Sequence, residues 1–216
     1  SSVTDMSSMF HNPGHYINGR YDTSNSSSFN NPIGEWETKN VKDMSSMFYG
    51  AGFFDQDISK WDTSSVTDMA YMFMKAERFN NSGKEVSIFL PDNKPKPIEW
   101  DTKKVRSMYN MFRGAKSFDQ SISTWDTSSV TSMADMFRNA ERFNQDISTK
   151  PVKDKKGNTY RAWDTKNVKD MSYMFSGTKA FNYWIGNWNT SSVKNMSYMF
   201  YESLFNQHIG GWTTSS

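Results

Sequence analysis

The chain has 216 residues, of which 36% are hydrophobic and 22% are charged, and its formal net charge at pH 7 is +2. This length allows one good-sized domain, and no stretch approaches the roughly 18 to 20 apolar residues of a membrane-spanning helix. So small a net charge gives no general attraction to nucleic acid. The absence of cysteine removes disulfides, thiolate nucleophiles and cysteine-based zinc sites together.

One repeated motif explains the high methionine content. Fourteen of the 15 methionines fall in the pattern V-x-x-M-x-x-M-F, and each copy is followed by a second Phe, an Asn or Asp, an Ile, a Trp and a Thr. The copies run from Val3 to Phe10, Val41 to Phe48, Val66 to Phe73, Val105 to Phe112, Val130 to Phe137, Val168 to Phe175 and Val193 to Phe200. Repeats therefore account for nearly the whole chain.

The repeat length predicts an α/β repeat solenoid similar to leucine-rich repeats, because the shortest units are 25 residues apart, as between Val41 and Val66. We expect about seven coils, each with a short parallel strand and a short helix or turn. In one coil, a strand over 59–64 would point Trp61 and Thr63 inward. The segment that follows would turn into a short helix, with its Met and Phe side chains on one face.

The repeated apolar columns are expected to form the core rather than a cofactor or metal site. Methionine adapts to neighbours of different size, and aromatic columns fill a broad interior. One such column contains Trp36, Trp61, Trp100, Trp125, Trp163, Trp188 and Trp212.

Two polar columns have structural explanations. In the acidic column, we expect each Asp to accept the backbone N–H two residues on, and a calcium role is the minor alternative. Its members are Glu37, Asp62, Asp101, Asp126, Asp164 and Asn189. The second column should be a ladder that satisfies backbone groups at a corner of each coil. Its members are Asn30, Asp55, Asn80, Asp119, Asn144, Asn182 and Asn206.

The strings WDTSSVTDMAYMF at 61–73 and FNQDIS at 143–148 carry a family resemblance. They resemble the BspA-like leucine-rich repeat surface proteins, specifically the subgroup of mycoplasma-type surface lipoproteins. The resemblance implies an extracellular, cell-surface protein that adheres to host matrix proteins or other cells and has no enzymatic activity. It carries over no binding residue, because the shared motif is the scaffold.

The outward residues before each motif valine alternate between two types. Those that follow an insertion read ETKNVK, DTKKVR and DTKNVK, whereas the others read DTSSVT or NTSSVK. This strand face is one candidate protein-binding surface, and its candidate residues are Lys39, Asp62, Asp101, Lys103, Asp126, Asp164 and Lys166.

Three insertions, at about 11–28, 82–97 and 149–162, interrupt alternate repeats. Loops on a rigid scaffold commonly carry specificity. The middle insertion has a strand-like run at 85–90, and the third reads as a hairpin that turns near Gly157. The candidate ligand-binding residues of the insertions are Tyr16, Phe89, Lys94, Lys96, Lys155 and Tyr160.

Metal and catalytic readings find little support in the sequence. His11 and His15 have helical ligand spacing, but Pro13 and Gly14 lie between them, so we expect no metal and no cofactor. A Gly-rich phosphate loop and a nucleophile elbow are also missing. The sequence does not exclude a hydrolase that uses paired carboxylates, although its acids would come from positions that recur in most repeats. The chain is therefore expected not to be an enzyme.

The leading interpretation is a surface array that binds a protein ligand, without nucleic-acid binding or direct membrane insertion. A glycan-binding module that uses Phe53, Phe89, Tyr160, Tyr183 and Trp184 is the second, and a structural spacer in a surface assembly is another. Ice binding would need an exposed threonine column, which our register turns inward. Both ends lack cap-like sequence, so we expect an excerpt of a longer array, or neighbouring repeats or subunits at the ends.

Overall fold

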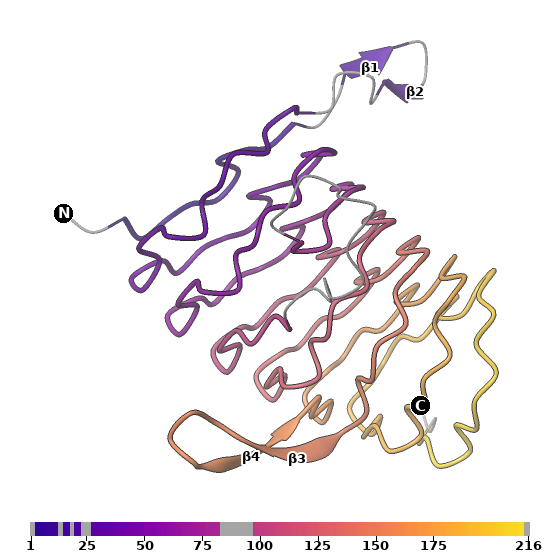
Figure 1. The fold of residues 1–216 in the computed structure, drawn as a ribbon. Helices are drawn as coiled ribbons and strands as arrows, with labels where there is room; N and C mark the ends of the chain where they lie inside the picture. Colours follow the sequence, from indigo (N-terminus) through magenta and orange to yellow (C-terminus); the bar gives the residue numbers. More distant parts are fainter. Residues whose placement is uncertain (1–2, 13–14, 18–19, 23–26, 83–96, 214–216) are drawn as a thin grey trace, which may run out of the picture.

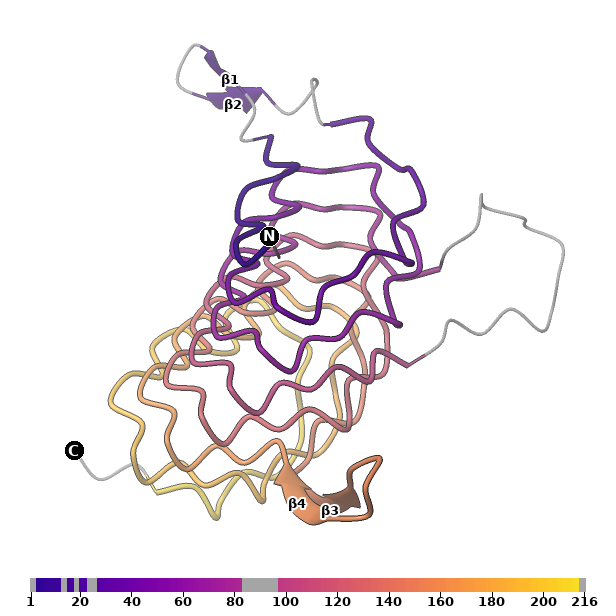
Figure 2. The same ribbon diagram turned by 90° about the vertical axis from the view of Figure 1, so that its left-hand side faces the viewer.

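A computed structural model describes residues 3–12, 15–17, 20–22, 27–82 and 97–213 of the chain. The repeats wind into coils that stack from the N-terminal to the C-terminal end (Figures 1 and 2). The described residues contain four short strands and no helix: β1 (His15–Ile17), β2 (Arg20–Asp22), β3 (Lys150–Lys153) and β4 (Thr159–Ala162). They accordingly include no helix long and apolar enough to cross a membrane.

The predicted strand in each coil is wrong. Residues 59–64 form a turn followed by irregular chain, although Trp61 and Thr63 do point inward as expected. Parallel pairing between coils is limited to one bridging residue per motif, two positions after its valine. These residues, in order, are Asp5, Asp43, Asp68, Ser107, Ser132, Asp170 and Asn195.

The predicted helix after each strand is also wrong, because the backbone N–H groups divide between two kinds of partner. In one coil, the N–H groups of Tyr71 and Phe73 donate to carbonyls of the next coil at 2.8 and 2.9 Å. The intervening N–H of Met72 donates to the carbonyl of Met69, three residues back. An α-helix would direct all these donors four residues back within the segment. The segment is therefore a run of tight turns joined to the next coil.

Left-handed backbone conformations distinguish these turns from an α-helix. Tyr71 and Lys75 have φ of 61° and 59°, and Asn110 and Gly114 have φ of 57° and 72° in the next coil. A right-handed helix cannot include such residues. The predicted α/β leucine-rich-repeat-like solenoid is thus corrected to coils of turns and irregular chain without helices. Apolar spacing failed to separate the two because both conformations bury the same Met and Phe residues.

The predicted core is confirmed. Methionine, phenylalanine and valine of the interior motifs are almost fully buried. Phe48 stacks on Phe73 and Phe73 stacks on Phe112, with ring centroids 5.3 and 5.5 Å apart. Trp100 and Trp125 stack in the same way at 6.0 Å. The end positions Trp36 and Trp212 are the less buried members of the tryptophan column.

Side-chain ladders run parallel to the aromatic columns. In the Asn/Asp ladder, the Asp119 side chain accepts the N–H of Asn144 at 2.9 Å, and the Asn144 side chain accepts the N–H of Asn182 at 3.1 Å. This ladder was predicted and is confirmed. In the tryptophan column, each indole from Trp61 onward also donates to an isoleucine carbonyl of the preceding coil, as Trp125 does to Ile98 at 2.7 Å. The threonine column is buried, as the predicted register requires.

The third insertion is described throughout, and the first is described in part. The third forms the predicted hairpin, in which β3 pairs antiparallel with β4. The first forms a hairpin that was not predicted, in which β1 pairs antiparallel with β2. The two hairpins leave the stack on opposite sides (Figures 1 and 2). The predicted strand-like run at 85–90 lies outside the described residues.

Replacing Gly114 with alanine distinguishes the left-handed turn from the helix that the sequence predicted, because the two conformations give stability changes of opposite sign. Alanine pays about 1 to 2 kcal/mol at a left-handed φ, and no atom lies closer than 3.8 Å to a Cβ added there. We expect Gly114→Ala to lower the free energy of unfolding by about 1 kcal/mol in urea denaturation. In a helix, the same change would raise it by about 1 kcal/mol. Gly114→Asn is the matched control and should cost less, because asparagine tolerates this conformation.

Asp55 predicts a pH-dependent contribution to stability. Burial raises the pKa of its carboxyl, against hydrogen bonds from Ser82 and from the N–H of Asn80 that lower it. A pKa above the unfolded value means that ionised Asp55 disfavours folding as pH rises through that pKa. We expect Asp55→Asn, which keeps the acceptor oxygen, to raise the free energy of unfolding at pH 7 by up to about 1 kcal/mol. The gain should vanish near pH 3; an equal loss at both pH values would contradict this.

Candidate functional site

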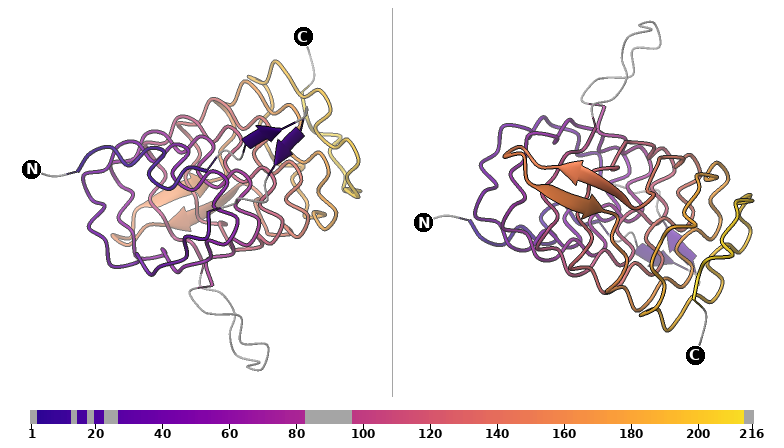
Figure 3. Two further views of the ribbon diagram at one scale, coloured as in Figure 1. Left: turned by 90° about the horizontal axis from the view of Figure 1, so that it is seen from above. Right: turned by 90° about the horizontal axis from the view of Figure 1, so that it is seen from below.

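The β3–β4 hairpin lies along the outward rung residues instead of projecting into solvent. The Tyr160 hydroxyl donates to the carbonyl of Thr124 at 2.5 Å, which fixes β4 to a coil. Viewed from below, the hairpin extends across coils that precede it in the chain (Figure 3). The structure therefore brings two predicted sites, the strand face and the third insertion, into one surface.

The acidic column has the predicted turn structure. The carboxylates of Asp62, Asp101, Asp126 and Asp164 each accept the N–H two residues on, at 3.0 to 3.2 Å. Asn189 makes the same contact in a later coil. These hydrogen bonds confirm the structural explanation of the column. One side of each carboxyl group is engaged by the backbone.

Charge couples the hairpin to this column. The Ser64 hydroxyl lowers the pKa of Asp62, and the cations of Lys39 and Lys155 lower it further. Burial raises the pKa of Tyr160, and the carboxylates of Asp126 and Asp101 add to the effect. Lys155 of the hairpin therefore places positive charge near the acidic column.

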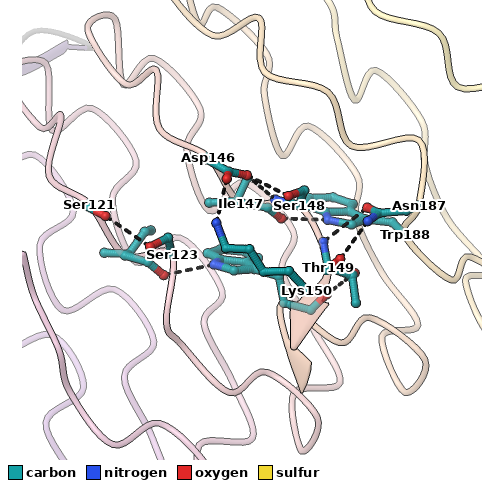
Figure 4. A network of polar contacts seen from close by, with 11 residues as sticks. Ser121, Ser123, Asp146, Ile147, Ser148, Thr149, Lys150, Asn187 and Trp188 are labelled. Carbon is teal, nitrogen blue, oxygen red and sulfur yellow. Dashed lines mark hydrogen bonds and ion pairs between the residues drawn. The ribbon is translucent and has the colours of Figure 1, made fainter. Parts of the chain in front are cut away.

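The base of the hairpin is held by paired hydrogen bonds (Figure 4). Thr149 donates its N–H to Asn187 at 3.1 Å, and the Asn187 amide donates back to the Thr149 carbonyl at 2.7 Å. Lys150 binds the Asp146 carboxylate at 2.5 Å. Burial alone would raise the pKa of Asp146, but hydrogen bonds from Lys150 and Ser148 lower it. Such anchors make the hairpin a fixed part of the surface.

The other predicted residues are the rung lysines, Tyr16 of the first insertion and three residues of the middle insertion. Lys39, Lys103 and Lys166 are exposed, and Lys166 pairs with Asp164 at 3.3 Å. Tyr16 is on β1, at the other side of the stack from the β3–β4 hairpin (Figure 2). The candidates Phe89, Lys94 and Lys96 fall outside the described residues.

Three of the five aromatic residues proposed for glycan binding are exposed. Phe53, Tyr183 and Trp184 have exposed fractions of 41, 44 and 48%. The guanidinium of Arg78 covers the ring of Phe53 at 4.2 Å. Tyr160 is half-buried by the stack, and its hydroxyl is already engaged.

Sequence reasoning missed a polar face on the left-handed turns. Arg113 and Arg138 both approach Asp135, at 3.8 and 3.0 Å, and Arg138 covers the ring of Tyr173 at 4.6 Å. Tyr71 packs edge-on against Tyr109. The predicted helix would have placed these side chains differently, so the sequence did not bring them together. The available signal was the variety of residue types two positions after the first motif methionine, directly before the second methionine, which is constant.

In the part of the chain that the structure describes, no three His, Cys, Asp or Glu residues are grouped closely enough to hold a metal ion. The acids that lie closest to the hairpin serve as turn acceptors. The geometry is that of a repeat scaffold with a composite polar surface.

The class defined by this geometry is a repeat protein whose interior is uniform and whose surface varies. Residues 1–90, 87–157 and 150–216 each match the family described as Mycoplasma protein of unknown function, DUF285. The chain therefore belongs to this repeat family, in three tandem matches. No curated protein and no solved structure shows significant similarity to it.

Replacing Tyr160 with phenylalanine tests how the hairpin is held. The loss of one hydrogen bond of about 1 kcal/mol should make local opening several-fold more frequent. Amide hydrogen exchange at residues 152–160 should accelerate, while the midpoint of global unfolding changes little. Tyr183→Phe is the matched control, because that phenol is exposed. Unchanged exchange in Tyr160→Phe would show that other contacts hold the hairpin.

Proposed function

We propose that this chain is a non-catalytic, extracellular repeat domain of a BspA-like surface lipoprotein that binds a protein ligand. The binding surface combines the rung residues with the β3–β4 hairpin. The observation that carries the proposal is the contact of Tyr160 with the Thr124 carbonyl, which makes the insertion and the repeats one continuous surface.

A rigid support favours binding without a large ordering cost. The aromatic interior and the hydrogen-bonded hairpin base fix the positions of the surface residues. Asp62 and Lys103 are exposed on this support, and Lys153, Lys155 and Lys156 are exposed on the hairpin. A partner with patches of both charges would complement this surface.

A non-catalytic role is supported by the way the acids are used. Asp101 and Asp164 occupy equivalent positions of different coils and accept equivalent backbone N–H groups. Catalysis needs a unique arrangement of reacting groups. Repetition of one arrangement favours a scaffold.

Glycan binding is the second candidate function, and the adjacent exposed side chains of Tyr183 and Trp184 favour it. Aromatic faces with polar tips suit sugar rings. A glycan array probed with wild type and with Trp184→Ala tests this alternative separately. A hit that survives Trp184→Ala would remove Trp184 from consideration.

The protein-binding proposal is tested by surface plasmon resonance against immobilised fibronectin, laminin and collagen at physiological salt. We expect saturable binding to at least one of these proteins. Replacing residues 152–160 with a two-residue turn should weaken it at least tenfold, because the hairpin is one of the two parts of the proposed surface. The replacement keeps Thr149 and Ala162, which belong to the stack.

Asp126→Asn serves as the second variant in that assay. The amide oxygen can still accept the Ser128 N–H, as Asn189 does for Ser191, so the fold is retained while one charge is lost. We expect several-fold weaker binding. Tyr183→Phe, an exposed position outside the proposed surface, is the point control and should bind as wild type. Binding that survives hairpin removal unchanged would refute the composite surface.

A further inference from the structure

A row of cations follows the coils beside the acidic column, and we call it the basic ridge. Its residues lie within the two positions before and the one position after the motif valines, and all are exposed. They are Lys39, Lys42, Lys103, Lys104, Arg106, Lys166, Lys169 and Lys194. Three clusters occur on alternate coils, and Lys194 extends the row into the last motif.

Most of these cations lack an acidic partner. Lys166 pairs with Asp164 at 3.3 Å, whereas the other seven form no ion pair within the described residues. The neighbouring carboxylates of Asp101 and Asp62 keep their charge, but each is held in place by a backbone N–H and forms no ion pair with a ridge cation. The ridge therefore presents to solvent seven ammonium and guanidinium groups that are unpaired within the described part of the chain, although the net charge of the whole chain is only +2.

The backbone beneath the ridge is fixed. Arg106 donates its N–H to Thr67 at 2.9 Å, Thr131 donates to Arg106 at 2.9 Å, and Lys169 donates to Thr131 at 2.8 Å. With a rise of about 4.8 Å per coil, cation clusters two coils apart recur at about 10 Å. A rigid periodic row of charge suits an extended polymer with repeated anionic groups better than a compact anion.

The coils between the cation clusters carry hydroxyl groups. Their equivalent positions hold Ser64, Ser65 and Thr67 in one coil and Ser128, Ser129 and Thr131 in another. Thr67 and Thr131 are exposed, and their hydroxyls donate to the carbonyls of Lys42 and Arg106 at 3.2 and 3.3 Å, which leaves the hydroxyl oxygens able to accept. Cations that bind sulfate or carboxylate groups thus alternate with hydroxyl groups that can hydrogen-bond to sugar hydroxyls.

We propose that the basic ridge binds a linear anionic polysaccharide that lies along the stack. Sulfate or carboxylate groups would meet the cation clusters, and sugar hydroxyls would meet the serine and threonine rungs. The ridge contains no aromatic residue on which a nucleic-acid base could stack, which disfavours single-stranded nucleic acid. It also contains no exposed apolar residue for insertion into a lipid surface. This site goes beyond the protein-binding proposal and does not depend on it.

The test uses fluorescent heparin oligosaccharides as the sulfated probe and hyaluronate oligosaccharides as the carboxylated probe. Wild type should bind at least one of them saturably at physiological salt, with affinity that falls as salt rises. The triple variant Lys103→Gln, Lys104→Gln, Arg106→Gln should bind at least tenfold more weakly. Its plot of log affinity against log salt should also be less steep, because fewer cations are neutralised.

The matched control is Lys60→Gln, Lys116→Gln, Lys179→Gln, which removes the same charge outside the ridge. Lys60 and Lys116 pair with Glu35 and Glu77, respectively. This control should bind within twofold of wild type. Thermal unfolding of both variants checks that the stack is intact, and a folded ridge variant is expected because other coils carry uncharged residues at the same positions.

Three results would overturn the proposal: no saturable binding of either probe, equal losses in the ridge and control variants, or tighter binding of a DNA duplex of matched charge than of both polysaccharides. The variant with the shortened hairpin separates this site from the protein-binding surface. It removes Lys153, Lys155 and Lys156 but no ridge residue, so heparin binding should fall less than in the triple ridge variant, whatever the outcome with matrix proteins.

Discussion

The backbone of the V-x-x-M-x-x-M-F segment must satisfy its N–H groups without forming a helix or a broad sheet. It does so by alternating partners, so that Tyr71 and Phe73 bind the next coil while Met72 closes a turn. Unpaired backbone groups in a buried segment would cost free energy comparable to lost hydrogen bonds. Each coil therefore depends on its neighbour, and stability belongs to the stack rather than to any single repeat.

This dependence explains why the interior is uniform. A change of register in one coil would misplace the N–H donors and the aromatic ring together, because Phe73 both donates to Met111 and stacks on Phe112. The indole of Trp100 adds a third link to the preceding coil through the carbonyl of Ile58. Outward side chains carry no such constraint. The coils can therefore differ in charge on the surface while they remain equivalent inside.

The sequence was sufficient for the repeat, the core columns and the side-chain ladders, because these follow from which residues recur. The local backbone conformation could not be predicted from the recurrence of residues. Met69 and Met72 have helical spacing, yet the left-handed φ of Tyr71 lies between them, and tyrosine gives no sign of that conformation. Glycine at the second left-handed position, as at Gly114, was the available sign. The course of the β3–β4 hairpin depends on the Tyr160 contact with Thr124, which pairs residues far apart in sequence.

Alternation of charged and neutral coils has a physical consequence for the ridge. Two like charges in water repel by about 0.8 kcal/mol at 5 Å and about 0.4 kcal/mol at 10 Å before salt screening. A cation cluster on every coil would meet the larger repulsion, whereas clusters on alternate coils meet the smaller one. The acidic column occurs on successive coils, as at Asp101 and Asp126, and each of its carboxylates accepts a backbone N–H. Apart from Lys166, which pairs with Asp164, the cations have no such internal partner among the described residues, which leaves their charge available to an external one.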